Sequence, residues 1–219
     1  MAVLVKICGI NSSEAADAAV RAGVDLVGLT FHPGSPRNVS LDQAAALAER
    51  MRGRARLVAM TSGASDAALG EIMRAAAPDF VQLHGGESPV RAAEIRSRFG
   101  VAVIKVVSVA EAGDLRGVEA YEDASDMLMF DAKAPAGATR EGGHGAVFDW
   151  QIIRGRRFTR PWLLAGGLTP ENVARAIQIS GAPGVDVSSG VEDAPGLKSA
   201  DKIAAFVAAA RGAQVGAAA

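Results

Sequence analysis

The residues of this sequence best suited to chemistry are a cysteine and an aspartate, each of which ends an apolar run. Cys8 is the one cysteine among 219 residues and closes the run that begins at Val3. Asp131 follows four apolar residues, 127–130. The thiolate is the reactive form of cysteine, and a carboxyl in partly apolar surroundings has a raised pKa and can act as an acid. We therefore predict that Cys8 and Asp131 are catalytic.

Each of these residues also has a structural interpretation. A lone cysteine is often a small buried hydrophobe. Lys6 favours reactivity, because the two-residue period of a strand places it on the face of Cys8, where a cation lowers a thiol pKa. For Asp131, the alternative role is a salt bridge to Lys105 or Lys133.

Two further side chains follow apolar runs and could contact a ligand. Arg37 lies in a turn-rich segment, and its guanidinium suits a two-point grip on a carboxylate, although a free surface cation is also possible. His84 ends another run, where it could contact a ligand or bond to the backbone.

Glycines and serines after the last two apolar runs predict a phosphate site. These residues are Gly166, Gly167, Ser188, Ser189 and Gly190. Backbone N–H groups in such loops, with a helix N-terminus behind them, hold anions well. No cluster of residues with metal-ligand spacing is visible, so we expect no metal.

The elements that must position these residues are strands that alternate with alanine-rich helices. Eight apolar runs cover residues 3–8, 25–31, 56–61, 79–84, 102–108, 126–131, 161–166 and 184–188. Helix patterns cover 14–21, 44–51, 67–76, 90–99, 111–121, 150–153, 172–179 and a last stretch from Gly196 through Ala210. This alternation predicts an α/β fold, a single-domain (β/α)8 TIM barrel over residues 1–212 with a frayed tail at 213–219. A doubly wound sheet is the alternative, but its dinucleotide-binding glycine pattern is missing.

The overall composition indicates which binding partners and which cellular compartment to expect. The formal net charge is −1 at pH 7, which supplies no basic excess for nucleic acid or an acidic membrane. A single cysteine excludes an internal disulfide and fits the reducing cytoplasm. No apolar run approaches the ~18 residues of a membrane span. A glycine-containing loop at 134–145 is long enough for a lid.

Taken together, these segments resemble the phosphoribosylanthranilate isomerase family. The resemblance is carried by residues 6–10, 35–37, 81–85, 130–131, 142–145, 148–150, 164–173 and 185–192. It implies a cofactor-free Amadori rearrangement in tryptophan biosynthesis, which converts N-(5-phosphoribosyl)anthranilate into the carboxyphenylamino-deoxyribulose phosphate. The sequence leaves monomer and homodimer open.

The resemblance also implies roles for individual residues. Asp131 would be the general acid and Cys8 the general base. Arg37 would hold the anthranilate carboxylate, and Asp186 would touch a sugar hydroxyl. His84 is predicted to contact substrate from its position at the end of an apolar run, and the resemblance itself assigns it no role. The glycines and serines named above would bind the phosphate.

The sequence departs from the family pattern at two places. His144 replaces a small polar residue, and residues 59–61 replace a valine-phenylalanine pattern.

Three other functions compete with this interpretation. Indole-glycerol-phosphate synthase would need a lysine acid and an N-terminal extension, and a ribulose-phosphate epimerase would need metal ligands. A barrel that only binds a phosphate ligand would not need both a thiol and a carboxyl at its rim.

Overall fold

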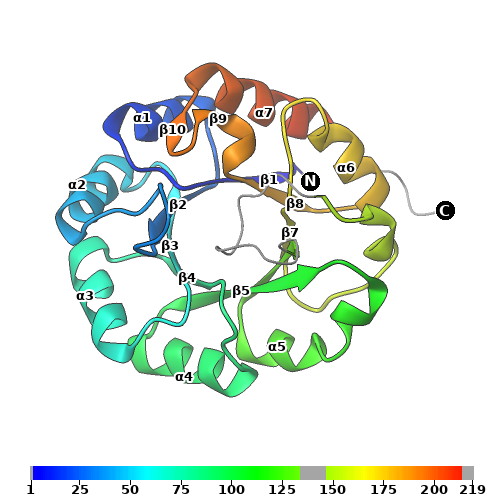
Figure 1. Ribbon diagram of the computed structural model, residues 1–219, viewed down its shortest axis with the longest axis horizontal. Helices are drawn as coiled ribbons and strands as arrows, with labels where there is room; N and C mark the ends of the chain where they lie inside the picture. The colour runs from blue at the N-terminus through cyan, green and yellow to red at the C-terminus, as the bar shows by residue number, and fades with distance from the viewer. Residues whose placement is uncertain (1, 134–146, 214–219) are drawn as a thin grey trace.

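Eight parallel strands form a closed barrel, and helices surround it on the outside (Figure 1). The computed structural model describes residues 2–133 and 147–213. The barrel strands are β1 Leu4–Cys8, β2 Leu26–Phe31, β3 Arg56–Thr61, β4 Phe80–Leu83, β5 Ala102–Val109, β6 Met127–Ala132, β7 Trp162–Leu164 and β8 Gly184–Val187. Each strand pairs with the next along the chain, and β8 pairs with β1. The predicted barrel and its eight strands are confirmed.

Serine caps mark the start of each of the first four helices. The helices are α1 Ser13–Ala22, α2 Leu41–Met51, α3 Asp66–Ala76, α4 Pro89–Phe99, α5 Glu119–Ala124, α6 Val173–Ser180 and α7 Ala200–Gly212, with short 3₁₀ turns η1 Ala112–Leu115, η2 Trp150–Ile152 and η3 Ser189–Val191. Ser12 caps α1 by accepting from the backbone of Ala15, and Gly23 ends it in the left-handed conformation.

Two predicted helices differ from the structure. The single helix expected at 111–121 is divided into η1 and α5, with Gly117 between them at φ +77°. The last helix was expected to start at Gly196, but this residue lies instead in a small hairpin, formed by β9 Glu192–Ala194 and β10 Leu197–Lys198. Its turn holds Gly196 at φ +83°, and a Cβ there would lie 2.6 Å from the carbonyl oxygen of Pro36. This close approach requires glycine and prevents a helix from starting earlier.

The barrel interior and the layer under the helices are separate parts of the core. Interior side chains come from alternate strand positions: Leu26, Val58, Phe80, Ile104, Val106, Met127, Met129, Leu163 and Ala165. Intervening residues such as Val27 and Leu164 pack against the helices. Because the side chains alternate, the inward face of β1 also carries Lys6 and Cys8.

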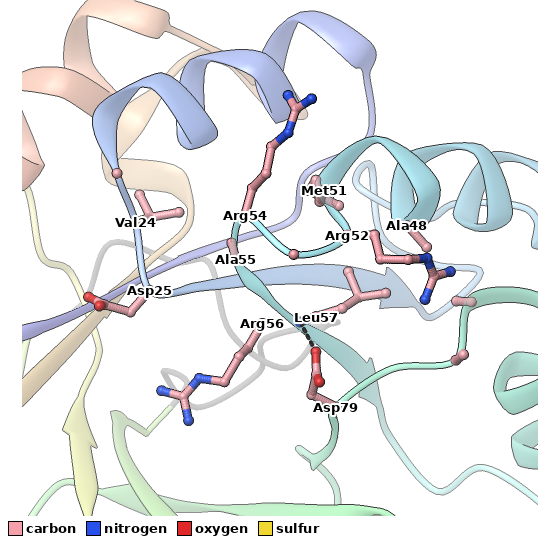
Figure 2. A pocket seen from close by; sticks show the side chains of 14 residues that line it. Val24, Asp25, Ala48, Met51, Arg52, Arg54, Ala55, Arg56, Leu57 and Asp79 are labelled. Carbon is pink, nitrogen blue, oxygen red and sulfur yellow. Dashed lines mark hydrogen bonds between the residues drawn. The ribbon is translucent and has the colours of Figure 1, made fainter.

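Aspartates clamp strand pairs at the amino ends of the strands. The N–H of Val5 donates to the carboxylate of Asp25, while the N–H of Asp25 donates back to the carbonyl of Val5. The same two-way bond joins Leu57 with Asp79, whose carboxylate is shown in Figure 2, and Val103 with Asp126. Each aspartate thus ties an odd strand to the even strand that follows it.

A hollow of about 540 Å³ lies at this same end of the barrel (Figure 2). Its lining includes the clamp residues Asp25 and Asp79 and the arginines 52, 54 and 56. Arg52 pairs with Glu49, and Arg56 lies over the ring of Phe80. Barrel chemistry belongs to the opposite end, so we assign this hollow to the face that stabilises the fold.

Two expectations fall on residues that the structure does not describe. They are the lid at 134–145, including His144, and the tail beyond Ala213. Among the described residues, none of the helices has the length and apolar character to cross a membrane.

Candidate active site

Cys8 lies inside the barrel at the carboxyl ends of the strands, which we call the mouth of the barrel. A glycine on the neighbouring strand leaves the space for its side chain. A Cβ on Gly28 of the neighbouring strand would lie 2.9 Å from the Cys8 sulfur and 3.3 Å from the Lys6 ammonium. Glycine at position 28 therefore makes room for both side chains. Cys8 itself is 6% exposed, so a ligand in the mouth can reach only the end of its side chain.

An ion pair lies directly below the thiol. Lys6 is fully buried, and its Nζ is 2.7 Å from Oδ1 of Asp186. Burial disfavours the charged ammonium, but Asp186 and Cys8 outweigh this cost and raise the pKa of Lys6. Asp186, predicted to touch a sugar hydroxyl, is thus engaged with Lys6 in this structure.

The surroundings of Cys8 correct one expectation. Burial raises the pKa of the Cys8 thiol, although Lys6 and Lys198 oppose the shift. Lys6 does act to lower the thiol pKa, as expected, but the expected net lowering is wrong, because desolvation is the larger effect and Asp186 adds to it. The thiol form is favoured before any ligand arrives.

Asp131 meets a histidine at the mouth. Oδ2 of Asp131 lies 3.2 Å from Nε2 of His84, with both side chains largely but not fully covered. Neither lysine considered from the sequence pairs with it: Lys133 contacts Asp114, and Lys105 contacts Glu87.

Gln82 extends this contact into the barrel. Its amide nitrogen is 3.5 Å from Nδ1 of His84, and its amide oxygen is buried with no partner among the described residues. Gln82, His84 and Asp131 therefore form a polar row from β4 to β6. The role of Gln82 was missed from sequence, where it is one polar residue in an apolar strand.

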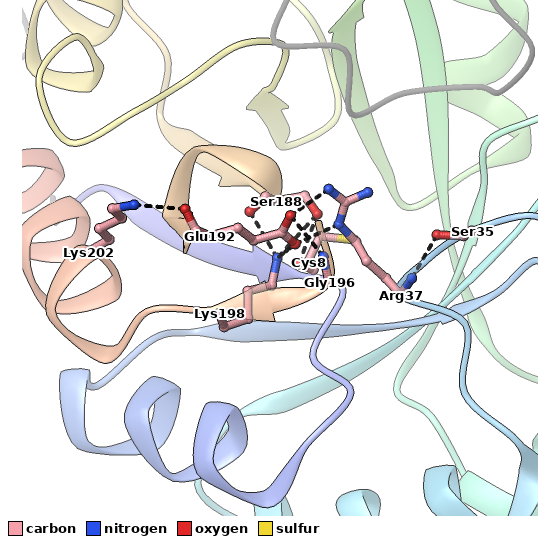
Figure 3. Close-up of polar contacts among 8 residues, drawn as sticks. All are labelled: Cys8, Ser35, Arg37, Ser188, Glu192, Gly196, Lys198 and Lys202. Carbon is pink, nitrogen blue, oxygen red and sulfur yellow. Dashed lines mark hydrogen bonds and ion pairs between the residues drawn. The ribbon is translucent and has the colours of Figure 1, made fainter. Parts of the chain in front are cut away.

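Arg37 is held by a carboxylate of the chain itself. Its Nε and Nη2 donate to the two oxygens of Glu192 at 2.7 Å each (Figure 3). Lys198 also contacts Glu192, at 2.8 Å. Neither Glu192 nor Lys198 received a role from sequence, and the only signal was two opposite charges flanking a Pro-Gly turn.

The two predicted phosphate loops pack against each other. A Cβ on Gly190, after β8, would lie 1.9 Å from the carbonyl oxygen of Leu168, after β7. A Cβ on Gly166 would lie 2.5 Å from the backbone nitrogen of Ala132, so the first loop also packs against the end of β6. Asn172 fixes the first loop by bonding to Thr169 and Gly167. The loops after β7 and β8 thus form one compact backbone surface.

The order of strands arranges the mouth. In the closed sheet β6, β7, β8 and β1 are consecutive. Asp131 on β6 and Cys8 on β1 therefore flank the two glycine- and serine-rich loops. Within the described part of the chain, no three His, Cys, Asp or Glu residues are grouped as metal ligands.

Comparison with known proteins identifies close relatives. A family model described as N-(5'-phosphoribosyl)anthranilate isomerase matches residues 5–209. The isomerase of that name from Paramagnetospirillum magneticum is 51% identical over 97% of this chain and 99% of its own length. That from Rhodopseudomonas palustris is 50% identical over 98% of each chain.

Solved structures agree with these relatives. The phosphoribosyl anthranilate isomerase from Thermotoga maritima has a TM-score of 0.86 and 35% identity, covering 96% of this chain and 99% of its own. A phosphoribosyl anthranilate isomerase in complex with reduced 1-(o-carboxyphenylamino)-1-deoxyribulose 5-phosphate has a TM-score of 0.82 and 33% identity, covering 96% of this chain and 99% of its own.

Proposed function

This chain belongs to the N-(5'-phosphoribosyl)anthranilate isomerase family and is an enzyme of tryptophan biosynthesis, and from that premise we propose that Asp131 and Cys8 perform its proton transfers. The reaction turns N-(5-phosphoribosyl)anthranilate into 1-(2-carboxyphenylamino)-1-deoxyribulose 5-phosphate. It is an aldose–ketose isomerisation, so atoms and electrons balance without a cofactor.

The first step opens the sugar ring. Asp131 gives its proton to the ring oxygen, the bond from that oxygen to C1 breaks, and the anthranilate nitrogen forms a protonated Schiff base with C1. In the second step Cys8 removes the proton on C2, and the electrons form a C1–C2 double bond. The resulting enolamine takes a proton at C1 and loses one from the C2 hydroxyl to give the ketone.

His84 and Gln82 are arranged to suit both protonation states of the acid. When the Gln82 amide nitrogen donates to Nδ1 of His84, Nε2 carries the hydrogen and donates to an ionised Asp131. When the amide is reversed, its oxygen accepts from Nδ1–H, and Nε2 accepts from a protonated Asp131. A neutral histidine thus accommodates the acid before and after it transfers its proton.

Substrate binding uses the two ends of the same molecule. Backbone groups of Gly166, Gly167 and the loop from Ser188 to Gly190 hold the phosphate, and Arg37 holds the anthranilate carboxylate. Asp186 remains available to a sugar hydroxyl through the carboxylate oxygen that is not bonded to Lys6.

One observation supports these assignments: Asp131 on β6 and Cys8 on β1 lie on either side of the loops that follow β7 and β8. A ribose anchored by its phosphate at these loops would lie between the proposed acid and the proposed base. The family match favours this reaction over those of the synthase and the epimerase considered from sequence.

The test follows the fluorescence of phosphoribosylanthranilate as it is consumed. Asp131→Asn and Cys8→Ser should each lower kcat by roughly 10²–10⁴-fold, the usual contribution of one acid or base. The matched control is Asp123→Asn, an exposed carboxylate on α5. Full activity in both site variants would overturn the assignments.

We also infer a cytoplasmic protein that acts as a monomer or homodimer on a phosphorylated small molecule, without nucleic acid or membrane. The single cysteine supports the compartment, and the net charge of −1 supports the absence of nucleic acid or an acidic membrane. For the oligomeric state, the support is a related dimeric isomerase from Thermotoga maritima, from which monomers have been generated.

A further inference from the structure

Beside the catalytic thiol lies a buried group of three charges, Arg37, Glu192 and Lys198 (Figure 3). They come from the loop after β2 and from the two strands of the β9–β10 hairpin. Their side chains are 8%, 4% and 0% exposed, respectively. Ion pairs this well covered are not ordinary surface pairs, whose contribution to stability is small.

The central carboxylate is saturated with donors. Oε1 of Glu192 accepts from Arg37 Nε and Lys198 Nζ, and Oε2 accepts from Arg37 Nη2 and the backbone of Gly196. Burial works against the charged form of Glu192, but Arg37 and Lys198 outweigh it and lower its pKa. The carboxylate is therefore ionised and fixed in orientation.

This arrangement decides which part of Arg37 a ligand can use. Glu192 occupies the Nε–Nη2 edge, so a second carboxylate has to bind at the Nη1–Nη2 edge. The side chain reaches this position by crossing Gly9, where a Cβ would lie only 2.4 Å from Cδ of Arg37. Without Glu192, the flexible arginine would have no fixed orientation.

The other end of the group touches the phosphate loop and the base. Lys198 donates to the carbonyl and the hydroxyl of Ser188 at 2.9 and 3.3 Å. The hydroxyl of Ser188 in turn donates to the carbonyl of Cys8 at 3.1 Å. These three charges thus connect Arg37, which we propose binds the carboxylate, with Ser188 of the proposed phosphate loop. Through Ser188 they also reach Cys8, which we propose removes the proton on C2.

We propose that Glu192 is a positioning residue for substrate selection: it holds Arg37 by one edge and thereby presents the other edge to the carboxylate of the substrate, while Lys198 anchors Glu192 to the phosphate loop. This rests on the proposed role of Arg37 and adds a residue that touches no substrate atom.

The test compares two ligands that each carry one end of the substrate. Anthranilate has the carboxylate, and ribose 5-phosphate has the phosphate. Glu192→Gln removes the charge but keeps the size of the side chain. It should raise KM and the inhibition constant of anthranilate about 10- to 100-fold, the scale for breaking a buried charge pair. The inhibition constant of ribose 5-phosphate and kcat should stay near the wild-type values.

Asp193→Asn is the matched control. Asp193 is the next residue along the chain, is exposed and pairs with Lys202, so its change should leave both inhibition constants unaltered. Equal weakening of both ligands in Glu192→Gln would indicate general damage to the mouth and would overturn the proposal.

A double variant shows whether Glu192 acts through Arg37. In an Arg37→Ala background, adding Glu192→Gln should cause no further loss of anthranilate binding, whereas additive losses would refute the proposal. If Glu192→Gln does not fold, Glu192→Asp keeps the charge and should show a smaller loss that is still selective for anthranilate; a loss shared with ribose 5-phosphate would count against it. Failure of the wild type to consume phosphoribosylanthranilate would instead refute the proposed function.

Discussion

At the scale of single residues, the proposed base Cys8 would have to lose a proton in surroundings that oppose its ionisation. Its pKa is raised by burial, so the thiol predominates at neutral pH and the thiolate fraction grows as pH rises. If Cys8 is the base, the ascending limb of kcat/KM should have its midpoint above the ordinary thiol value of about 8.5. A pH series in which chemistry limits the rate measures this midpoint, and a plateau already reached below pH 7 would contradict it.

The same shift predicts the reactivity of the free enzyme toward alkylation. Iodoacetamide should label Cys8 more slowly than a free thiol at pH 7, since only the thiolate reacts and the side chain is 6% exposed. Mass spectrometry of the labelled chain over time measures the rate. Faster labelling than glutathione would mean that Lys6 and Lys198 prevail over burial after all.

His84 offers a second test, because substrate binding and support of Asp131 have different kinetic signatures. His84→Phe removes the partner 3.2 Å from Asp131. If His84 acts through the acid, kcat should fall by about 10- to 100-fold with little change in KM. Gln82→Leu should change the same parameter to a smaller extent. A rise in KM alone would make His84 a substrate contact, as its position at the end of an apolar run predicts.

At the scale of elements, the surface that we propose binds phosphate depends on two loops whose backbones meet at Gly190 and Leu168. Gly190→Ala places a Cβ against the carbonyl of Leu168 and should push the loops apart. Misplacement of about 1 Å can cost roughly 100-fold, so we expect KM and the inhibition constant of inorganic phosphate to rise by about 10- to 100-fold. Gly86→Ala is the control, since a Cβ there meets nothing within 4 Å. Equal behaviour of the two variants would mean that the loops do not bind phosphate.

Prediction from sequence was most successful for the positions of the secondary-structure elements, but some of these elements were not predicted. The end of β1 at Cys8 and the end of β6 one residue after Asp131 could be predicted, because a run of apolar residues and its boundary are local properties. The β9–β10 hairpin could not, because Gly196 is required by contact with Pro36, 160 residues earlier in the chain. In the same way, Arg37 and Glu192 are 155 positions apart, and only the folded chain reveals that they pair.

At the scale of the whole molecule, stability and chemistry lie at opposite ends of the barrel. Asp126 directly precedes β6, and its carboxylate accepts from the backbone N–H of Val103 at 2.9 Å, while Asp131 lies near the other end of β6. Asp126→Ala should lower the free energy of unfolding by about 1–2 kcal/mol. For a chain of this size that lowers Tm by roughly 2–8 °C.

The kinetic constants of Asp126→Ala should stay at wild-type values, because the clamp is remote from the mouth. Thermal unfolding followed by circular dichroism gives Tm, and the fluorescence assay gives kcat. Asp123→Ala, an exposed residue of the preceding helix, is the control and should change neither. A loss of kcat without a loss of Tm would place Asp126 in the catalytic machinery instead.

The aspartate clamps also determine where the chain can be divided without breaking one of them. Each carboxylate bond stays within one strand pair: β1 with β2, β3 with β4, and β5 with β6. A break at Gly100, between α4 and β5, therefore severs none of them, whereas a break at Ser125 separates Val103 from Asp126. A break at Gly53, between α2 and β3, also severs none, but the break at Gly100 is the one of these two that leaves four barrel strands in each fragment, β1 to β4 and β5 to β8. Exchange of segments between relatives at Gly100 should therefore keep every clamp intact.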